Sequence, residues 1–151
     1  MSDDRGLPEA EPFRGRGRDN RLQPGSRLGR QVLIDLYDCP REVLDDEKLI
    51  AASMIAAARE AGAAVVGSTF HRFSPCGVSG VVAIRESHLA IHTWPEFGYA
   101  AIDLFTCGDG VDPWIAHDAL KRALGAGRGE AIELPRPGAN GGWPGDEVKS
   151  K

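Results

Sequence analysis

The residues best able to do chemistry gather between residues 70 and 108 of this 151-residue chain. Serine, histidine, cysteine and glutamate side chains are set there between short apolar runs that are typical of β-strands. A polar reactive group inside a strand costs free energy unless it is hydrogen-bonded or has a function. The density of such residues therefore indicates an active site built on a sheet.

Each of these residues also has an ordinary structural explanation. His71 or His92 in a strand is more often a hydrogen-bonded core histidine than a catalyst, and Cys107 is more often a small buried apolar residue. Ser79 fits the chemistry of a turn, and Glu96 fits a surface carboxylate. Taken one at a time, these residues would not predict an enzyme.

Their combination allows two general kinds of site. In an extended strand His88 and His92 share one face, with Ser87 on the other. A serine or cysteine nucleophile with a histidine base would make a hydrolase triad, but no G-x-S-x-G motif surrounds Ser87. A metal site would need a third ligand beside the histidines, and the HExxH motif is missing from the sequence.

The elements that must position these residues predict one α+β domain. Strand patterns cover residues 29–37, 63–73, 81–86, 88–94, 99–108 and 130–135, and helical patterns cover residues 45–61 and 113–124. This order is typical of a mainly antiparallel β-sheet with two helices packed on one face, a two-layer sandwich. The two central strands are expected to meet at the bond between Glu86 and Ser87.

Composition predicts a single globular domain with loose ends. The chain is 42% hydrophobic and 26% charged, which suits one compact core. Residues 1–27 are rich in Gly, Pro, Arg and Asp and are expected to form a disordered extension. The domain is expected to span residues 28–136, followed by a loose tail over residues 137–151.

Charge and cysteine content narrow the partners and the compartment. A net charge of -4 gives no general attraction to nucleic acid or to an anionic membrane. Three widely spaced cysteines without a CxxC pair argue against a disulfide framework and a zinc site, and they fit a reducing cytoplasm. The first residues lack the basic start and apolar run of a signal peptide, and no later segment is apolar and long enough to span a bilayer.

A longer match in the sequence is more specific than any of these patterns. Residues 68–114, STFHRFSPCGVSGVVAIRESHLAIHTWPEFGYAAIDLFTCGDGVDPW, closely resemble the prokaryotic S-adenosylmethionine decarboxylase proenzymes. These are pyruvoyl-dependent lyases of polyamine (spermidine) biosynthesis. The likeness extends from about residue 29 to about residue 136, and its ESHLAIHTWPE and YAAIDLFTCG blocks are long and unusual.

The resemblance implies that this chain cuts itself. In the family the peptide bond before the serine of ESH is cleaved, which here is Glu86-Ser87. The Ser87 hydroxyl would attack the Glu86 carbonyl, and loss of the Ser87 α-proton would then expel the Glu86 carboxylate. His92 matches the histidine that accepts this proton, and Ser79 matches the serine that assists processing. Loss of ammonia would leave a pyruvoyl group on the chain that begins at residue 87.

The resemblance also implies the roles of the remaining residues. The pyruvoyl group would form a Schiff base with S-adenosylmethionine and accept the electrons released with carbon dioxide, so neither pyridoxal phosphate nor a metal is expected. Cys107 matches the cysteine that returns a proton to the substrate carbon. Phe73 and Trp94 would sandwich the adenine, and Glu96 would hold the ribose hydroxyls. The family also implies a homodimer of processed protomers.

Two positions depart from the family pattern. Gln31 stands where many members have histidine, and Arg85 stands where they have a small residue. An inward Arg85 would repel a sulfonium substrate, whereas an outward Arg85 would lie in solvent. Two alternatives therefore stay open, a pyruvoyl-dependent arginine or ornithine decarboxylase of the same family and an uncleaved regulatory paralogue.

Overall fold

The computed structural model describes residues 28–136 and 149–150. The expected N-terminal extension, residues 1–27, lies outside these residues, as does most of the expected tail, residues 137–148 and 151. The elements in chain order are β1 (Arg30–Tyr37), α1 (Arg41–Leu44), α2 (Glu47–Glu60), β2 (Val65–Arg72), β3 (Val78–Ile84), β4 (Ser87–Trp94), the 3-10 turn η1 (Pro95–Phe97), β5 (Tyr99–Thr106), α3 (Pro113–Ala123), β6 (Arg128–Pro135) and β7 (Lys149–Ser150).

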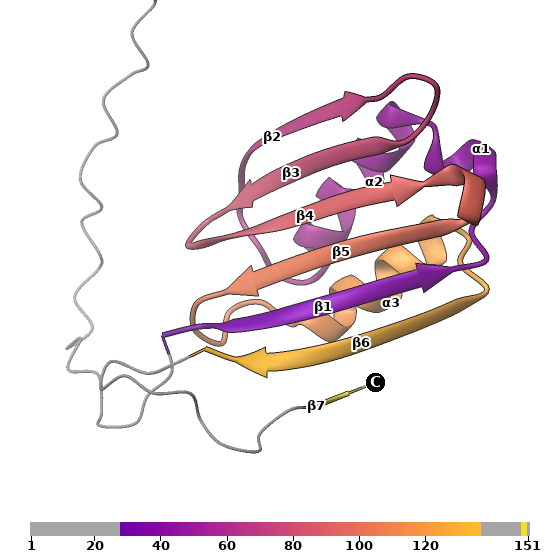
Figure 1. The fold of residues 1–151 in the computed structure, drawn as a ribbon. Coiled ribbons are helices and arrows are strands. Elements are labelled where there is room, and N and C mark those ends of the chain that lie inside the picture. The colour runs from indigo at the N-terminus through magenta and orange to yellow at the C-terminus, as the bar shows by residue number, and fades with distance from the viewer. Residues whose placement is uncertain (1–27, 137–148, 151) are drawn as a thin grey trace, which may run out of the picture.

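The described strands form one antiparallel sheet in the order β2-β3-β4-β5-β1-β6-β7 (Figure 1). Consecutive strands β2 to β5 pair as a meander, and β1 lies between β5 and β6. The predicted antiparallel sheet is confirmed. The two-residue strand β7 pairs with β6 inside the segment that was expected to be a loose tail.

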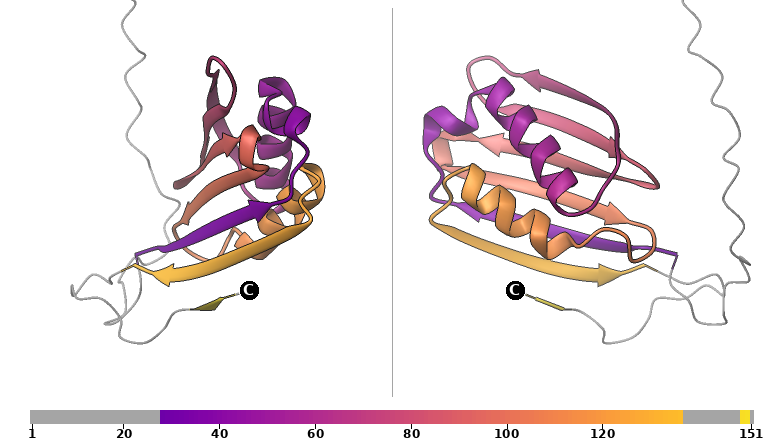
Figure 2. Two further views of the ribbon diagram at one scale, coloured as in Figure 1. Left: turned by 45° about the vertical axis from the view of Figure 1, so that its right-hand side comes forward. Right: turned by 180° about the vertical axis from the view of Figure 1, so that it is seen from behind.

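Helices α2 and α3 lie side by side on one face of the sheet (Figure 2). Their caps follow from the sequence, because the Asp46 carboxylate accepts from the first amides of α2 and the Asp112 carboxylate accepts from the Trp114 amide of α3. The two-layer sandwich is therefore confirmed. The short helix α1 was not predicted, since it is only four residues long and directly follows Pro40.

Side chains alternate along the strands between two different environments. One face packs against the helices and carries the buried residues Val32, Ile34, Leu36, Val82, Ile84, Leu89, Ile91, Ile102 and Leu104. The other face carries no helix among the described residues (Figure 2). We call it the open face, and by register it carries Gln31, Leu33, Asp35, Tyr37, His71, Ser79, Val81, His88, His92, Trp94, Tyr99, Asp103 and Phe105.

Candidate active site

The expected cleavage bond lies in a tight hairpin between β3 and β4. Ile84 pairs with Ser87, so Arg85 and Glu86 form a two-residue loop. Such loops favour turns with a positive φ at the first or at both loop residues. Here only the second loop residue, Glu86, has a positive φ, of 66°. A non-glycine residue in this conformation stores strain, and the strain lies next to the Glu86-Ser87 bond.

The Ser87 side chain is placed beside this strained residue. Its Oγ is buried and has no hydrogen-bond partner. Most buried hydroxyls in folded proteins are paired, so an unpaired one calls for an explanation such as a catalytic role. An unpaired hydroxyl next to the Glu86 carbonyl has the chemistry of a nucleophile that is not held by any competing bond.

Cys107 lies at the same end of the sheet. The β4–β5 register pairs His88 with Phe105, and its continuation places Ser87 opposite Thr106. Cys107 is the next residue along, which puts it across from the Glu86-Ser87 bond. Its side chain is half-buried rather than the fully buried small apolar residue of the ordinary explanation.

Ser79 and His92 form a pair across β3 and β4 on the open face. The Ser79 Oγ lies 2.6 Å from Nδ1 of His92, a short hydrogen bond. His71 lies opposite Ser79 on the third strand, β2. Both His71 and His92 are exposed, so the interpretation of either as a core histidine is wrong. Ser79 lies within β3, so its interpretation as a turn residue is wrong too.

The expected substrate-binding residues lie at the end of the sheet where β2 ends and β4 ends. Phe73 and Trp94 are 47% and 37% exposed, which leaves aromatic surface free for a ligand. Phe73 contacts the His71 ring edge to face at 4.7 Å between centroids. The Glu96 carboxylate contacts the Cys76 sulfur at 3.5 Å. The pKa of the Cys76 thiol is raised, mainly by partial desolvation and secondly by this contact with Glu96.

An aromatic row that sequence reasoning missed supports Trp94 on the open face. The ring of Trp94 stacks on Tyr99, and Tyr99 stacks on Tyr37, each at 5.3 Å between centroids. The Tyr99 hydroxyl donates to the Asp35 carboxylate at 2.5 Å, and burial together with this bond raises the pKa of Tyr99. One face of Trp94 is therefore already covered. The alternation of Asp35 with Tyr37 on a predicted strand was a signal that could have found this row.

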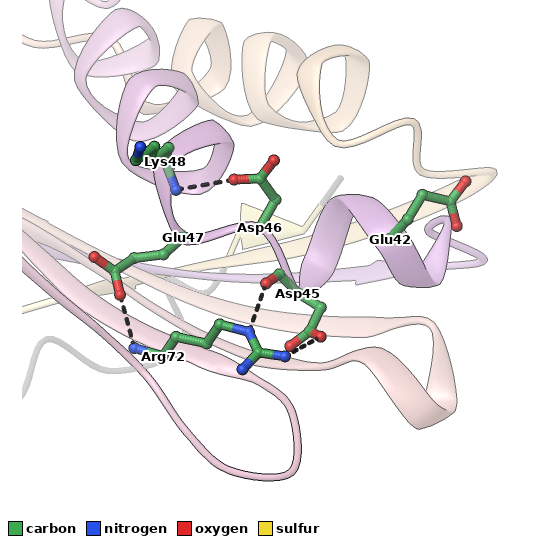
Figure 3. A pocket seen from close by; sticks show the side chains of 6 residues that line it. All are labelled: Glu42, Asp45, Asp46, Glu47, Lys48 and Arg72. Carbon is green, nitrogen blue, oxygen red and sulfur yellow. Dashed lines mark hydrogen bonds and ion pairs between the residues drawn. The ribbon is translucent and has the colours of Figure 1, made fainter.

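A charged network ties the loop after β2 to the junction of α1 and α2 (Figure 3). The Arg72 guanidinium donates to the Asp45 carboxylate at 2.6 Å, and the Arg72 amide donates to Glu47. Asp45 also accepts from the Gly77 amide, and these bonds hold the pKa of Asp45 below its usual range. A shallow surface pocket of about 570 Å³ surrounds the network and is lined by Glu42, Asp45, Asp46, Glu47, Lys48 and Arg72. The network fixes the loop that carries Phe73.

Gln31 and Arg85, the two residues that depart from the family pattern, have no unusual surroundings. Gln31 is on the open face, with its amide nitrogen 3.5 Å from Asp103. Arg85 is exposed, so of the two orientations considered its side chain takes the outward one, in solvent. Within residues 28–136 and 149–150 the His, Cys, Asp and Glu side chains form no group of three or more that could hold a metal.

The candidate site residues therefore form two groups that lie apart within one chain. Five residue-to-residue steps along an extended strand lead from Ser87 to His92, a span of about 16 Å. By register their side chains also project from opposite faces of the sheet. The cleavage group consists of Glu86, Ser87 and Cys107. The open-face group consists of Ser79, His92 and Trp94 on the open face, together with Phe73, which directly follows β2, and Glu96, which lies in η1 directly after β4.

The chain is similar in sequence to proteins of known function. The sequence pattern of the S-adenosylmethionine decarboxylase family matches residues 30–137. The chain belongs to this family. The S-adenosylmethionine decarboxylase proenzyme of Thermotoga maritima is 62% identical over 109 residues, which are 72% of this chain and 84% of that protein. The proenzyme of Pseudomonas aeruginosa is 55% identical over 108 residues, which are 72% of this chain and 68% of that protein.

A solved structure supports the fold of this S-adenosylmethionine decarboxylase family member. The crystal structure of the adenosylmethionine decarboxylase from Aquifex aeolicus is 33% identical in sequence and superposes with a TM-score of 0.67. The match covers 73% of this chain and 91% of that chain. The family and the fold predicted from the sequence are both confirmed.

Proposed function

We propose that this chain is a self-cleaving S-adenosylmethionine decarboxylase proenzyme that converts its own Ser87 into a pyruvoyl group. The observation that carries the proposal is the strained Glu86 beside the buried, unpaired Ser87 hydroxyl. The chain's relatives are named proenzymes, and this local geometry is what an intramolecular cleavage needs. The same geometry has no purpose in an uncleaved regulatory paralogue.

The cleavage uses atoms of the chain and one water molecule. The Ser87 oxygen attacks the Glu86 carbonyl carbon, and the peptide bond is exchanged for an ester, which relieves the strain at Glu86. Removal of the Ser87 α-proton breaks the Cβ–O bond and releases Glu86 as a free carboxylate. Water then replaces the nitrogen of the resulting dehydroalanine, ammonia leaves, and the ketone remains. His92 accepts the α-proton, and Ser79 orients its ring through the 2.6 Å bond.

In the mature enzyme a pyruvoyl group at residue 87 would supply a ketone for the substrate amine and an acceptor for the electrons released with carbon dioxide. Cys107, which directly follows the residue opposite Ser87, supplies a proton to the substrate carbon. The free faces of Phe73 and Trp94 bind the adenine, and Glu96 accepts hydrogen bonds from the ribose. The product is the aminopropyl donor for spermidine synthesis. The named relatives favour S-adenosylmethionine over arginine or ornithine as the substrate.

The working site requires two copies of the chain. The span of about 16 Å between Ser87 and His92 is too long for direct proton transfer within one protomer. Pairing of the open faces in a homodimer can place the open-face group of one copy near the cleavage group of the other. It also covers the exposed apolar side chains of Leu33 and Val81 on that face.

The compartment proposed for the enzyme is the cytoplasm. All three cysteines are unpaired, which fits a reducing environment. Among the residues that the structure describes, no helix is long and apolar enough to cross a membrane.

The test is the denatured mass of the purified protein, followed by release of carbon dioxide from carboxyl-labelled S-adenosylmethionine. We expect two chains that break between Glu86 and Ser87, the second lighter than a serine-started fragment by one ammonia. Labelled arginine and ornithine serve as the competing substrates. A single full-length mass after long incubation contradicts the proposal, and release from arginine or ornithine alone contradicts the substrate.

A further inference from the structure

One arginine side chain is hydrogen-bonded to both ends of the loop that carries Cys107. The Arg30 Nε–H donates to the Thr106 hydroxyl at 3.3 Å, and a terminal N–H of the same guanidinium donates to the Val111 carbonyl at 2.7 Å. The two acceptors lie directly before Cys107 and four residues after it. The loop between them contains Gly108, which has a φ of 76°. Without these bonds a glycine-containing loop would leave the thiol free to move.

A buried carboxylate holds this arginine in place. The Glu133 carboxylate lies 3.6 Å from the Arg30 guanidinium, and its side chain is only 7% exposed. Arg30, Thr106 and Glu133 come from neighbouring strands, because β1 pairs with β5 through Arg30 and Thr106 and with β6 through Val32 and Glu133. A planar guanidinium can reach partners in several directions at once, whereas a lysine ammonium acts as a single point charge.

We propose that Arg30, held by Glu133, is a positioning residue that fixes the Cys107 thiol for the protonation step. The proposal rests on the proposed function, since it concerns the proton that Cys107 delivers. The polar partners of the Arg30 side chain are Thr106, Val111 and Glu133, not Glu86 or Ser87. Its hydrogen bonds to Thr106 and to Val111 restrain both ends of the loop.

The consequence of a misplaced thiol is a proton on the wrong carbon. Correct delivery would protonate the substrate carbon, and hydrolysis by one water molecule would then release the amine product and restore the ketone at residue 87. Delivery to the ketone-derived carbon, followed by hydrolysis, moves the substrate nitrogen onto the chain. The substrate carbon then leaves as an aldehyde, carbon dioxide is released, one proton is taken up, and residue 87 becomes alanine. The substrate carbon is oxidised and the chain carbon is reduced, so no outside oxidant is needed.

The decisive variant is the double substitution Arg30→Met with Glu133→Leu. It removes the loop bonds without leaving a buried carboxylate unpaired, which the single Arg30→Met would do. We expect a melting temperature near that of the wild type and complete cleavage before residue 87. We expect N-terminal sequencing after turnover to show about tenfold more alanine per product formed, because displacement of a reacting group by about 1 Å can change a rate by about a hundredfold.

Two further variants separate positioning from charge. Arg30→Lys keeps the charge but not the planar guanidinium, so we expect it to raise the alanine fraction as well. Arg122→Met serves as the matched control, because Arg122 forms an exposed ion pair with Glu60 on the helices. Wild-type alanine fractions in Arg30→Lys or in the double variant overturn the proposal.

A thiol measurement keeps this proposal separate from the proposed function. The background is Ser87→Ala, which cannot form the pyruvoyl group. In it we expect Cys107 to be alkylated about tenfold faster when Arg30 and Glu133 are replaced by Met and Leu, since loosening a loop exposes its side chains. Peptide mapping distinguishes Cys107 from the other two cysteines. An unchanged alkylation rate overturns the positioning role, whereas failure of the wild type to cleave overturns only the proposed function.

Discussion

The Ser79 hydroxyl and Nδ1 of His92 lie 2.6 Å apart on neighbouring strands, yet His92 stands about 16 Å along β4 from Ser87. The hydrogen bond fixes the imidazole on the exposed open face. In the proposed homodimer, His92 held in this way serves as the base for the serine of the second copy, because the serine of its own chain is too far away.

A complementation experiment tests this arrangement. Ser87→Ala and His92→Ala proenzymes are each expected to stay uncleaved when expressed alone. When they are co-expressed with different tags, one site of the mixed dimer combines Ser87 of the His92→Ala chain with His92 of the Ser87→Ala chain. We expect the His92→Ala chain to be cleaved, which denaturing gels of the tagged chains will show.

The control is co-expression of His92→Ala with a chain that carries both substitutions. This pair contains no His92 at all, so neither chain should be cut. If the His92→Ala chain also stays intact beside Ser87→Ala, the site is not shared between protomers.

The positive φ of Glu86 should speed cleavage of its peptide bond. Glycine adopts this conformation without strain, so Glu86→Gly stabilises the uncleaved chain relative to the transition state. Release of about 1 to 2 kcal/mol of strain corresponds to cleavage that is about 5-fold to 30-fold slower. The half-time of cleavage in freshly purified proenzyme measures the effect. Arg85→Gly is the matched control, because it alters the same loop at a residue that is not strained.

Much of the fold could be predicted from local sequence patterns. The pattern over residues 99–108 predicts a strand, which the structure has over residues 99–106, and the aspartates before residues 47 and 113 predict two helix starts. The position of β1 between β5 and β6 could not be predicted, because strand order depends on contacts between distant segments rather than on local propensity.

For the candidate site, the sequence names residues but does not predict how they are arranged in space. Ser87 and His92 are near in sequence, which predicts a single site, but a strand advances about 3.3 Å per residue and so places them far apart. The role of Arg30 at the Cys107 loop was missed as well. Its partners Thr106 and Glu133 come from other strands, and no local pattern links them to residue 30.

The buried Thr93 hydroxyl should matter for stability. It donates to the Leu44 carbonyl at 2.7 Å and accepts from the Val78 amide at 2.8 Å. Thr93→Val keeps the shape but leaves both groups unpaired, which we expect to lower the free energy of unfolding by about 1 to 3 kcal/mol. Urea unfolding measures this, and Thr69→Val, at an exposed position of β2, should be nearly neutral. Equal midpoints for the two variants would contradict the role of the hydroxyl.

The Asp45 carboxylate should give stability that depends on pH. Its pKa in the folded protein is lowered, first by the hydrogen bond from Arg72 and then by that from Gly77. A carboxylate with a lowered pKa stabilises the folded protein at any pH above its pKa in the unfolded chain, which is about 4 for aspartate. This stabilisation is lost as the pH falls through the pKa of the same group in the folded protein. We expect the melting temperature of Asp45→Asn to lie below that of the wild type at neutral pH and to converge with it in acid.

The control for Asp45 is Glu60→Gln, which breaks an exposed ion pair with Arg122. Such pairs contribute little, so this variant should follow the wild type across the pH range. A difference between Asp45→Asn and the wild type that persists undiminished in acid would show that the carboxylate charge is not responsible.

Tyr99 should act on substrate binding through Trp94. The two rings stack at 5.3 Å, and the Tyr99 hydroxyl is anchored on Asp35. Tyr99→Leu removes the support from a ring proposed to contact the adenine, and aromatic pairs of this kind contribute about 0.5 to 1.5 kcal/mol. We therefore expect KM for S-adenosylmethionine to rise about twofold to tenfold with kcat nearly unchanged. Tyr99→Phe keeps the stack and should show a smaller rise. Steady-state kinetics on fully cleaved enzyme give the answer, and a fall in kcat at constant KM would place Tyr99 in the chemical step instead.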